Sequence, residues 1–210
     1  MLKKEKYVYW KHPKIGPHFI FPTFITDYKG LSDKLNIRKT DYYKNKGGQT
    51  INLQNDLYFK ELKNRIKLSV IGILNNFYHP KNKYKVDVVS MWLNSNQKNM
   101  DHPPHNHLNT FLSGVFYLDG KENEFESLNL IRPYAIPNLP IINKYNEINS
   151  NVLHIKTTKD KVIFFPSYLM HYVMINKNNK PRISIAFDVM LRGSYGEIRT
   201  NDLTVGQYKI

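Results

Sequence analysis

The sequence contains no cysteine among its 210 residues. Disulfide bonds, thiolate metal sites and cysteine nucleophiles are therefore excluded, so a metal ion would have to be bound by His, Asp or Glu. Long apolar runs are also missing. The N-terminal stretch MLKKEKYVYWKHPKIGPHF carries charges but no continuous apolar segment of the kind that a signal peptide needs. No other run approaches the length of a membrane span, and we expect a cytoplasmic protein without a membrane segment.

Acidic residues are scarce compared with basic ones: 17 Asp and Glu stand against 31 Lys and Arg, which gives a formal net charge of +14. Such an excess points toward an anionic partner, such as an anionic substrate or nucleic acid. The lysines are spread along the whole chain and form no basic tail. The charge therefore fits a solvated surface as well as a functional basic face, and the composition leaves both open.

The length and the 41% hydrophobic content are sufficient for one well-buried core. We see no internal repeat and no linker, and we expect a single domain over residues 1–210. Residues 1–84 would provide strand and helix support, residues 85–191 the core, and residues 192–210 a C-terminal extension.

Apolar residues recur at alternating steps of three and four between Asp56 and His79, which predicts an amphipathic helix. Asn55 or Asp56 can cap its start, and Pro80 ends it. The helix would pack against the rest of the chain as a buttress. The predicted buried face consists of Phe59, Leu62, Ile66, Val70, Ile73 and Phe77.

Downstream of the helix the sequence changes to short β-rich runs separated by polar turns. Six or seven strands without intervening helices favour an antiparallel sandwich or barrel over a parallel α/β sheet. Residues 132–150, with three prolines, predict a long loop that either lies on the surface or closes over a substrate. The predicted strands are residues 85–93, 110–118, 127–131, 151–155, 162–165, 171–175 and 183–191.

Three histidines stand within six residues in HPPHNH, residues 102–107, directly before a predicted strand. Side chains at positions i and i+2 of a strand leave the same face, so His105 and His107 would point together toward one ion. Two imidazoles at this spacing suit a divalent first-row metal. An HxH pair also occurs without a metal, because histidine is commonly a satisfied or surface residue.

A second signal lies in VIFFPSYLMHYVMINKNNKPRISIAF, residues 162–187. A lone His171 follows a β-run and a Pro-Ser turn, and ten residues separate it from Arg182. Ser184 would share the strand face of Arg182. Burying an arginine in an apolar strand is costly unless an anion meets it, and a carboxylate fits its planar fork. The segment therefore indicates a carboxylate site near the histidines.

The motifs HxH…SGVFYL, FFPSYLMH and RISIAF, in this order, resemble those of the iron(II)- and 2-oxoglutarate-dependent oxygenases. The resemblance is strongest to a bacterial and phage subgroup with the motifs HxHxxxxxSGVYY, FPSxxxH and RxSIAFN. It is anchored by residues 92–188, and IFPTFI at residues 20–25 extends it toward the N-terminus. It implies a mainly β protein with a double-stranded β-helix, that is, a cupin-like jelly-roll, supported by the N-terminal α-helical buttress.

The resemblance assigns His105, His107 and His171 as ligands of iron(II) at the mouth of the jelly-roll. His107 stands where most of the superfamily has Asp or Glu, and the usual set is two histidines with one carboxylate. An acid such as Asp101 or Glu124 is the alternative third ligand, with His107 packing nearby.

By the same resemblance, Arg182 holds the distal carboxylate of 2-oxoglutarate, with Ser184 beside it. Tyr117 is either a third contact to this co-substrate or a core residue. Two positions depart from the motifs. Asp160 stands near the place of a turn glycine, which implies a differently shaped turn, and Asp188 stands in the place of an asparagine.

The remaining candidates have a structural explanation. We expect His102 beside the metal ligands or in solvent. Trp92 and Asn94 are expected to pack and cap the first core strand instead of contacting substrate. The histidines without partners at metal spacing are His12, His18, His79 and His154.

The function implied by the resemblance is that of an iron(II)- and 2-oxoglutarate-dependent dioxygenase. Such an enzyme would use O2 to hydroxylate an unidentified substrate, with release of succinate and carbon dioxide. If the protein is phage-encoded, it would act in the host cytoplasm. The alternatives are a metal-binding jelly-roll without catalytic activity and a basic accessory protein that binds nucleic acid.

Overall fold

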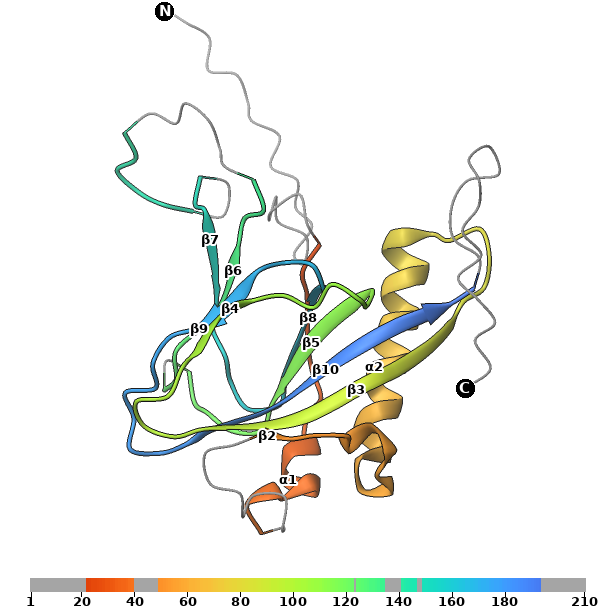
Figure 1. The fold of residues 1–210 in the computed structure, drawn as a ribbon, viewed down its shortest axis with the longest axis horizontal. Helices are drawn as coiled ribbons and strands as arrows, with labels where there is room; N and C mark the ends of the chain where they lie inside the picture. The colour runs from red at the N-terminus through yellow and green to blue at the C-terminus, as the bar shows by residue number, and fades with distance from the viewer. Residues whose placement is uncertain (1–21, 40–48, 123, 135–140, 147–148, 194–210) are drawn as a thin grey trace, which may run out of the picture.

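The computed structural model describes residues 22–39, 49–122, 124–134, 141–146 and 149–193. Its strands form two antiparallel sheets (Figure 1). The larger sheet has six strands in the order β1-β8-β5-β10-β3-β2, and the smaller has four in the order β4-β9-β6-β7. The strands are β1 (Phe24–Asp27), β2 (Gln49–Thr50), β3 (Lys85–Asn96), β4 (His102–His105), β5 (Leu112–Tyr117), β6 (Leu128–Ile131), β7 (Val152–Ile155), β8 (Lys161–Pro166), β9 (His171–Val173) and β10 (Arg182–Arg192).

All seven runs predicted as strands form strands, namely β3 and β5 to β10. Their apolar side chains form the cores on both sides of the larger sheet, which is why hydrophobic patterning detects them. The sequence did not place β1 (Phe24–Asp27), and it also did not predict β2 and β4. Strand β2 has two residues, and β4 contains Pro103 and Pro104, which are unfavourable inside a sheet. Strand β4 lies at the edge of its sheet, where proline is tolerated.

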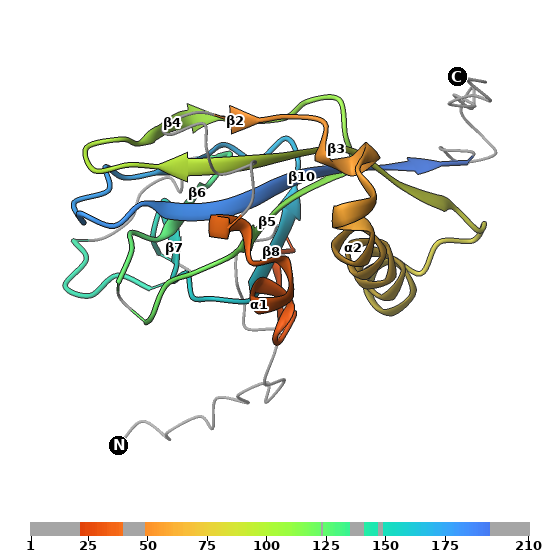
Figure 2. The same cartoon turned by 90° about the horizontal axis from the view of Figure 1, so that it is seen from below.

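Helix α2 (Lys60–Ile73) covers one face of the larger sheet (Figure 2). A 3-10 turn (Leu57–Phe59) precedes it, and a π-helical turn (Leu74–Tyr78) follows it. The Asp56 carboxylate accepts a hydrogen bond of 2.9 Å from the backbone N–H of Tyr58, so Asp56 caps the start as predicted.

Most of the predicted apolar face of this helix is buried against the sheet. Phe77 is an exception, because its side chain is 46% exposed. The π-helical turn changes the residue spacing after Ile73, so Phe77 leaves the buried face. Its ring still contacts Phe24 of β1, with ring centroids 5.0 Å apart.

The turn at Asp160 has the backbone conformation that a glycine would supply. Its φ of 66° lies in the left-handed region that glycine adopts most readily. The Asp160 carboxylate accepts hydrogen bonds from the backbone N–H groups of Gly30 and Ser32, at 2.8 and 2.9 Å, and from the Ser32 hydroxyl at 2.5 Å. These bonds attach helix α1 (Leu31–Leu35) to the turn before β8.

Strand β10 lies between two hydrophobic clusters. Because side chains alternate along a strand, Ile183, Ile185 and Phe187 face α2 and join the cluster on that side. Ala186 belongs to the cluster between the two sheets. That second cluster consists of Val115, Tyr117, Leu128, Leu130, Ile155, Ile163, Phe165, Leu169, Val173 and Ala186. The polar residues of β10 that alternate with the outer cluster therefore face the space between the sheets.

No helix in the described ranges is long and apolar enough to cross a bilayer. Residues 135–140 and 147–148 of the predicted loop lie outside the described residues, as do residues 194–210 of the expected C-terminal extension. The first two residues of IFPTFI also lie outside them.

Candidate metal centre

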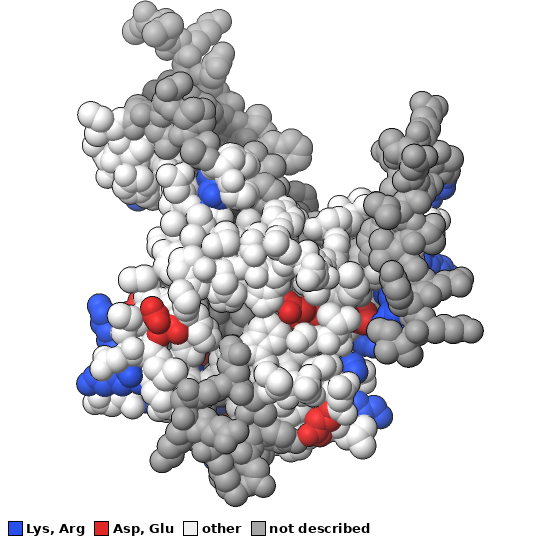
Figure 3. Space-filling model, viewed as in Figure 1, with Lys and Arg blue, Asp and Glu red and all other residues white. Residues whose placement is uncertain are grey.

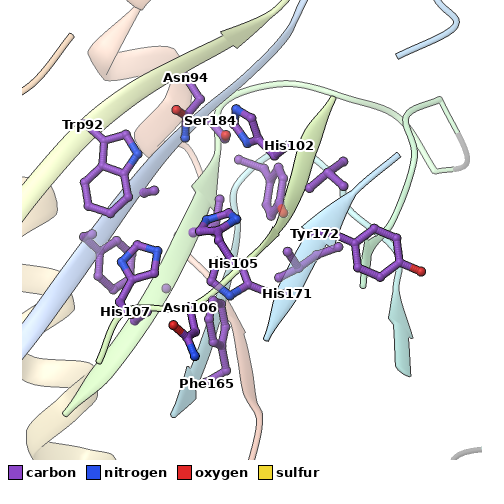
Figure 4. A pocket seen from close by; sticks show the side chains of 18 of the residues that line it. Trp92, Asn94, His102, His105, Asn106, His107, Phe165, His171, Tyr172 and Ser184 are labelled. Atoms are coloured by element: carbon purple, nitrogen blue, oxygen red, sulfur yellow. The ribbon is translucent and has the colours of Figure 1, made fainter. Parts of the chain in front are cut away.

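A cavity of about 490 Å³ lies between the two sheets. This volume is typical of a site for a small molecule. In Figure 4 the rings of His105, His107 and His171 cluster together, Trp92 lies beside His107, and His102 lies near Ser184 at the other side. The cavity therefore joins the histidines to the polar face of β10.

One possible ligand atom from each of His105, His107 and His171 lies within 4.8 Å of the other two. Within the described ranges, no other group of three or more His, Asp and Glu side chains has the spacing of metal ligands. Neither acid considered as an alternative ligand belongs to the group of three histidines. Asp101 is exposed, and the Glu124 carboxylate binds the backbone N–H of Lys121 and the Lys180 ammonium instead.

The three histidines come from two strands and a loop. His105 ends β4 and is in register with His171, which begins β9. His107 lies beyond the end of β4, so the expectation that it shares a strand with His105 is wrong. Its backbone N–H donates a hydrogen bond of 2.8 Å to the Ser167 carbonyl. This bond turns the chain so that His107 still faces the other two rings.

Backbone carbonyls set the tautomers of two of these rings. His105 Nδ1 lies 2.7 Å from the Pro103 carbonyl oxygen, and His171 Nδ1 lies 3.0 Å from the Leu169 carbonyl oxygen. A carbonyl oxygen only accepts, so each Nδ1 carries the hydrogen and donates it. The lone pair of Nε2 is thereby left available for a metal.

The environment of His107 is different. Its Nδ1 lies 3.0 Å from both carboxylate oxygens of Asp188, and the Ser113 hydroxyl donates a hydrogen bond of 2.6 Å to Asp188 Oδ1. Trp92 stacks on the imidazole, with ring centroids 5.5 Å apart and an interplanar angle of 15°. Its orientation is therefore set by a carboxylate and an aromatic face.

Burial keeps two histidines of the cavity neutral. It lowers the pKa of His171 to about 4, although the hydrogen bond to Leu169 acts in the opposite direction. Burial also lowers the pKa of His102 to about 4, and the charge of Arg182 adds to this effect. Neutral imidazole is the form that binds metal. His102 lies beside the ligands, with its ring centroid 6.5 Å from that of His105.

Arg182 brings a buried positive charge to the cavity. Its side chain is 3% exposed, and within the described residues Nε and Nη1 have no hydrogen-bond partner. Burial lowers the pKa of the guanidinium, so the charge is held at a cost in free energy. Ser184 and Tyr117 line the same cavity. Burial raises the pKa of Tyr117 to about 12, so its hydroxyl stays protonated.

Sequence reasoning missed three contributions to this cavity. Trp92 and Asn94, which we expected to pack and cap β3 at the end that faces the site, also line the cavity. The contact of Asp188 with His107 was also missed. The sequence did contain a signal for Asp188. Arg182, Ser184 and Asp188 follow one another in β10 at steps of two and four residues, so their side chains leave the same face.

Among the described residues, His79 and His154 are not part of the metal-binding group. His154 contacts Asn129, with its Nδ1 2.5 Å from Asn129 Oδ1. His79 ends the π-helical turn with a φ of 46°. His12 and His18 lie outside the described residues.

Comparison with solved structures identifies relatives of this fold. The structure of AviO1 from Streptomyces viridochromogenes Tue57 has a TM-score of 0.57 at 13% identity, over 81% of this chain and 90% of that one. Apo HygX from Streptomyces hygroscopicus has a TM-score of 0.58 at 11% identity, over 81% and 82%. A Pseudomonas putida prolyl-4-hydroxylase has a TM-score of 0.55 at 9% identity, over 82% and 89%. The predicted jelly-roll is confirmed.

A comparison with curated proteins gives no match. Comparison with family models gives a match over residues 90–188 to the family described as "Putative 2OG-Fe(II) oxygenase". The matched segment runs from β3 to Asp188 of β10 and contains the three clustered histidines, Arg182 and Ser184. Residues 90–188, just under half of the chain, therefore match the family of 2OG-Fe(II) oxygenases.

Proposed function

We propose that His105, His107 and His171 bind the iron(II) of this oxygenase and that Arg182 binds the distal carboxylate of 2-oxoglutarate. The observation that carries the proposal is the pair of buried, unpartnered guanidinium nitrogens in the cavity that the three histidines line. A buried arginine without a partner costs several kcal/mol unless an anion neutralises it. A dicarboxylate co-substrate supplies such an anion.

The donor set fits iron(II). Imidazole is a suitable ligand for iron, and three protein ligands leave positions open for a co-substrate and for O2. The ligand atoms lie within 4.8 Å of one another, a separation that small side-chain rotations close around one ion. When bound, iron(II) would supply the chemistry by which O2 oxidises 2-oxoglutarate to succinate and carbon dioxide and hydroxylates the substrate.

The side chains of the cavity hold and enclose the co-substrate. The planar fork of Arg182 matches a carboxylate, and the hydroxyls of Ser184 and Tyr117 are available as further donors on the same cavity wall. Apolar side chains, among them Val115 and Leu128, line the cavity and exclude water, which strengthens these interactions. Neutral His102 contributes no second positive charge beside Arg182.

The substrate belongs to the same proposal, and an anionic substrate is supported by the net charge of +14. On the face in Figure 3, Lys and Arg lie mainly toward the edges and the centre is largely uncharged. On the described surface of that face, Lys and Arg form no continuous track for a long nucleic acid. Binding to a DNA or RNA oligonucleotide that weakens steeply with added salt would support nucleic acid instead. We also propose a cytoplasmic location and a single domain over residues 1–210.

The test is an anaerobic titration of the protein with iron(II) and then with 2-oxoglutarate, monitored by the visible metal-to-ligand charge-transfer band. We expect the band in the parent. In Arg182→Ala, iron(II) affinity should be unchanged, and 2-oxoglutarate affinity should fall by at least about tenfold, because charged hydrogen bonds are lost.

The matched control is Arg192→Ala, which removes the same charge from the far end of β10. Arg192 binds Asp87 and does not line the cavity. We expect this variant to bind 2-oxoglutarate as the parent does. Equal 2-oxoglutarate affinity in Arg182→Ala and the parent would reject the assignment of Arg182, and a parent that binds no iron(II) would reject the histidine ligands.

A further inference from the structure

The proposed ligand set consists of three histidines and contains no carboxylate. A carboxylate nevertheless lies directly behind one of these histidines. His105 and His171 donate to backbone carbonyls, whereas His107 Nδ1 lies 3.0 Å from both oxygens of Asp188. Three neutral imidazoles bring no charge to a divalent ion. The Asp188 carboxylate is therefore separated from the metal position by the imidazole ring of His107.

Asp188 is held rigidly in this place. It is paired in register with Ser113 of β5, whose hydroxyl donates a hydrogen bond of 2.6 Å to Oδ1. The residue is 7% exposed, and Ser113 is 2% exposed. Two neighbouring central strands of the larger sheet thus fix the carboxylate beside His107.

No arginine or lysine of the described residues forms an ion pair with Asp188. Among the ion pairs of the described residues, its partner is His107. A buried carboxylate is costly unless it is paired with a cation. A divalent ion bound to the opposite nitrogen of His107 would supply that cation through the imidazole, because a ring that donates from Nδ1 to a carboxylate is a more basic ligand at Nε2.

We propose that Asp188 is a positioning residue for the metal site: it fixes the Nδ1–H tautomer of His107 and compensates, through that ring, for the carboxylate that the ligand set lacks. The inference rests on the proposed function, since it takes His107 as a ligand. Trp92 stacks on one face of the ring, and Asp188 sets its rotation through the contact with Nδ1.

The decisive variant is Asp188→Asn. An asparagine can accept from His107 through Oδ1 and donate to the Ser113 hydroxyl through Nδ2, so it removes the charge and retains the two contacts. We expect its iron(II) affinity, measured anaerobically by competition with a chelator, to fall by about 10- to 100-fold. With 2-oxoglutarate bound, its charge-transfer band should shift relative to that of the parent.

A double-mutant cycle shows whether Asp188 acts through His107. In a His107→Ala background, Asp188→Asn should change iron(II) affinity by less than about twofold, because the connecting ring is gone. The matched control is Asp87→Asn, which removes a carboxylate from β3 outside the cavity and should leave iron(II) affinity unchanged. An equal loss from Asp188→Asn in both backgrounds would show a general electrostatic effect and overturn the proposal.

The outcomes separate this inference from the proposed function. If the parent binds no iron(II), the histidine ligands themselves are wrong. If the parent binds iron(II) and Asp188→Asn binds it equally well, the role of Asp188 alone is overturned. Should Asp188→Asn fail to fold, the ¹⁵N resonances of His107 in the parent still test the tautomer, and a hydrogen on Nε2 of the metal-free protein would overturn the proposal.

Discussion

At the scale of single residues, the Tyr117 hydroxyl is a testable part of the co-substrate pocket. Tyr117 is 1% exposed and lines the cavity beside Arg182. We expect Tyr117→Phe to retain the fold and to weaken 2-oxoglutarate binding by about 2- to 12-fold, the equivalent of one hydrogen bond of about 0.5 to 1.5 kcal/mol. Calorimetric titration of the iron-loaded protein measures the change.

Tyr172→Phe is the control for this prediction. Tyr172 also lines the cavity, but Figure 4 shows its hydroxyl directed away from the histidines. We expect unchanged 2-oxoglutarate affinity in this variant. If both variants bind 2-oxoglutarate as the parent does, Tyr117 fills the core and makes no contact with the co-substrate.

The residues of the site differ in how far the sequence predicts them. Arg182 and Ser184 follow from the alternation of a strand, and an arginine in an apolar run signals an anion. The contact between His107 and Asp188 joins positions 81 residues apart, and it depends on the register of β5 and β10. No local pattern contains that register. Trp92 packs as expected, but its partner is His107, so it also lies on the cavity wall.

At the scale of the elements, Gly114 allows the central strands to pack closely. A Cβ atom at this position would lie 2.6 Å from the Ile163 carbonyl oxygen of β8 and would also overlap the Phe187 ring. We expect Gly114→Ala to lower the free energy of unfolding by about 1 to 3 kcal/mol, because β5 would have to shift against both neighbours. Urea denaturation measures the loss.

Gly72→Ala in α2 provides the contrast. No heavy atom lies within 4 Å of a Cβ built at Gly72, and the residue is inside a helix. Alanine should therefore raise the free energy of unfolding by about 0.5 to 1 kcal/mol. A loss of the same size at both positions would show that crowding is not the reason for glycine at position 114.

The turn at Asp160 attaches α1 to the larger sheet, and its energy should depend on pH. Burial raises the pKa of the Asp160 carboxyl, but hydrogen bonds from Ser32 and Gly30 and the charge of Lys159 outweigh burial and hold the pKa below the ordinary 3.8. A carboxyl with a lowered pKa stabilises the folded state fully above its unfolded pKa. That contribution is lost as the pH falls below 3.8 through the lower folded value.

Asp160→Asn removes the charge and tolerates the positive φ. We expect it to lower the free energy of unfolding by about 1 to 2 kcal/mol near neutral pH. The difference from the parent should shrink below pH 3.8, where the parent loses the same charge. Urea midpoints at several pH values measure the difference. Asp160→Gly keeps the backbone free of strain and should lose as much stability as Asp160→Asn. If Asp160→Gly were as stable as the parent, only the backbone conformation of this residue would matter.

The elements that bury an apolar pattern follow from the sequence, whereas α1 and β4 do not. Strands β3 and β10 bury apolar side chains with a period of two, and α2 buries Leu62, Ile66 and Val70 with a helical period. By contrast, α1 has only five residues, and β4 contains two prolines that are unfavourable inside a sheet. They are held by contacts distant in sequence, such as Asp160 with Ser32 and His105 with His171.

At the scale of the whole molecule, the larger sheet separates support from chemistry. Its outer face packs against α2 and α1, and its inner face forms the cavity with the smaller sheet (Figure 2). Because β10 contributes side chains to both faces, a change in the outer cluster acts on the strand that carries Arg182 and Asp188. We therefore expect α2 and the jelly-roll to unfold as one unit.

Ile66→Ala tests this expectation. Ile66 is fully buried on the inward face of α2, and its cluster includes Ile183, Ile185 and Phe187 of β10. Truncation should cost about 2 to 5 kcal/mol through lost burial and the cavity that remains. Circular dichroism of the helix and fluorescence of the tryptophans should then report one shared, lowered midpoint. The exposed Leu68 on the opposite face is the control, since Leu68→Ala should change stability little. Two separate midpoints in Ile66→Ala would mean that α2 is a dispensable addition, and that the jelly-roll holds its metal site without the helical support.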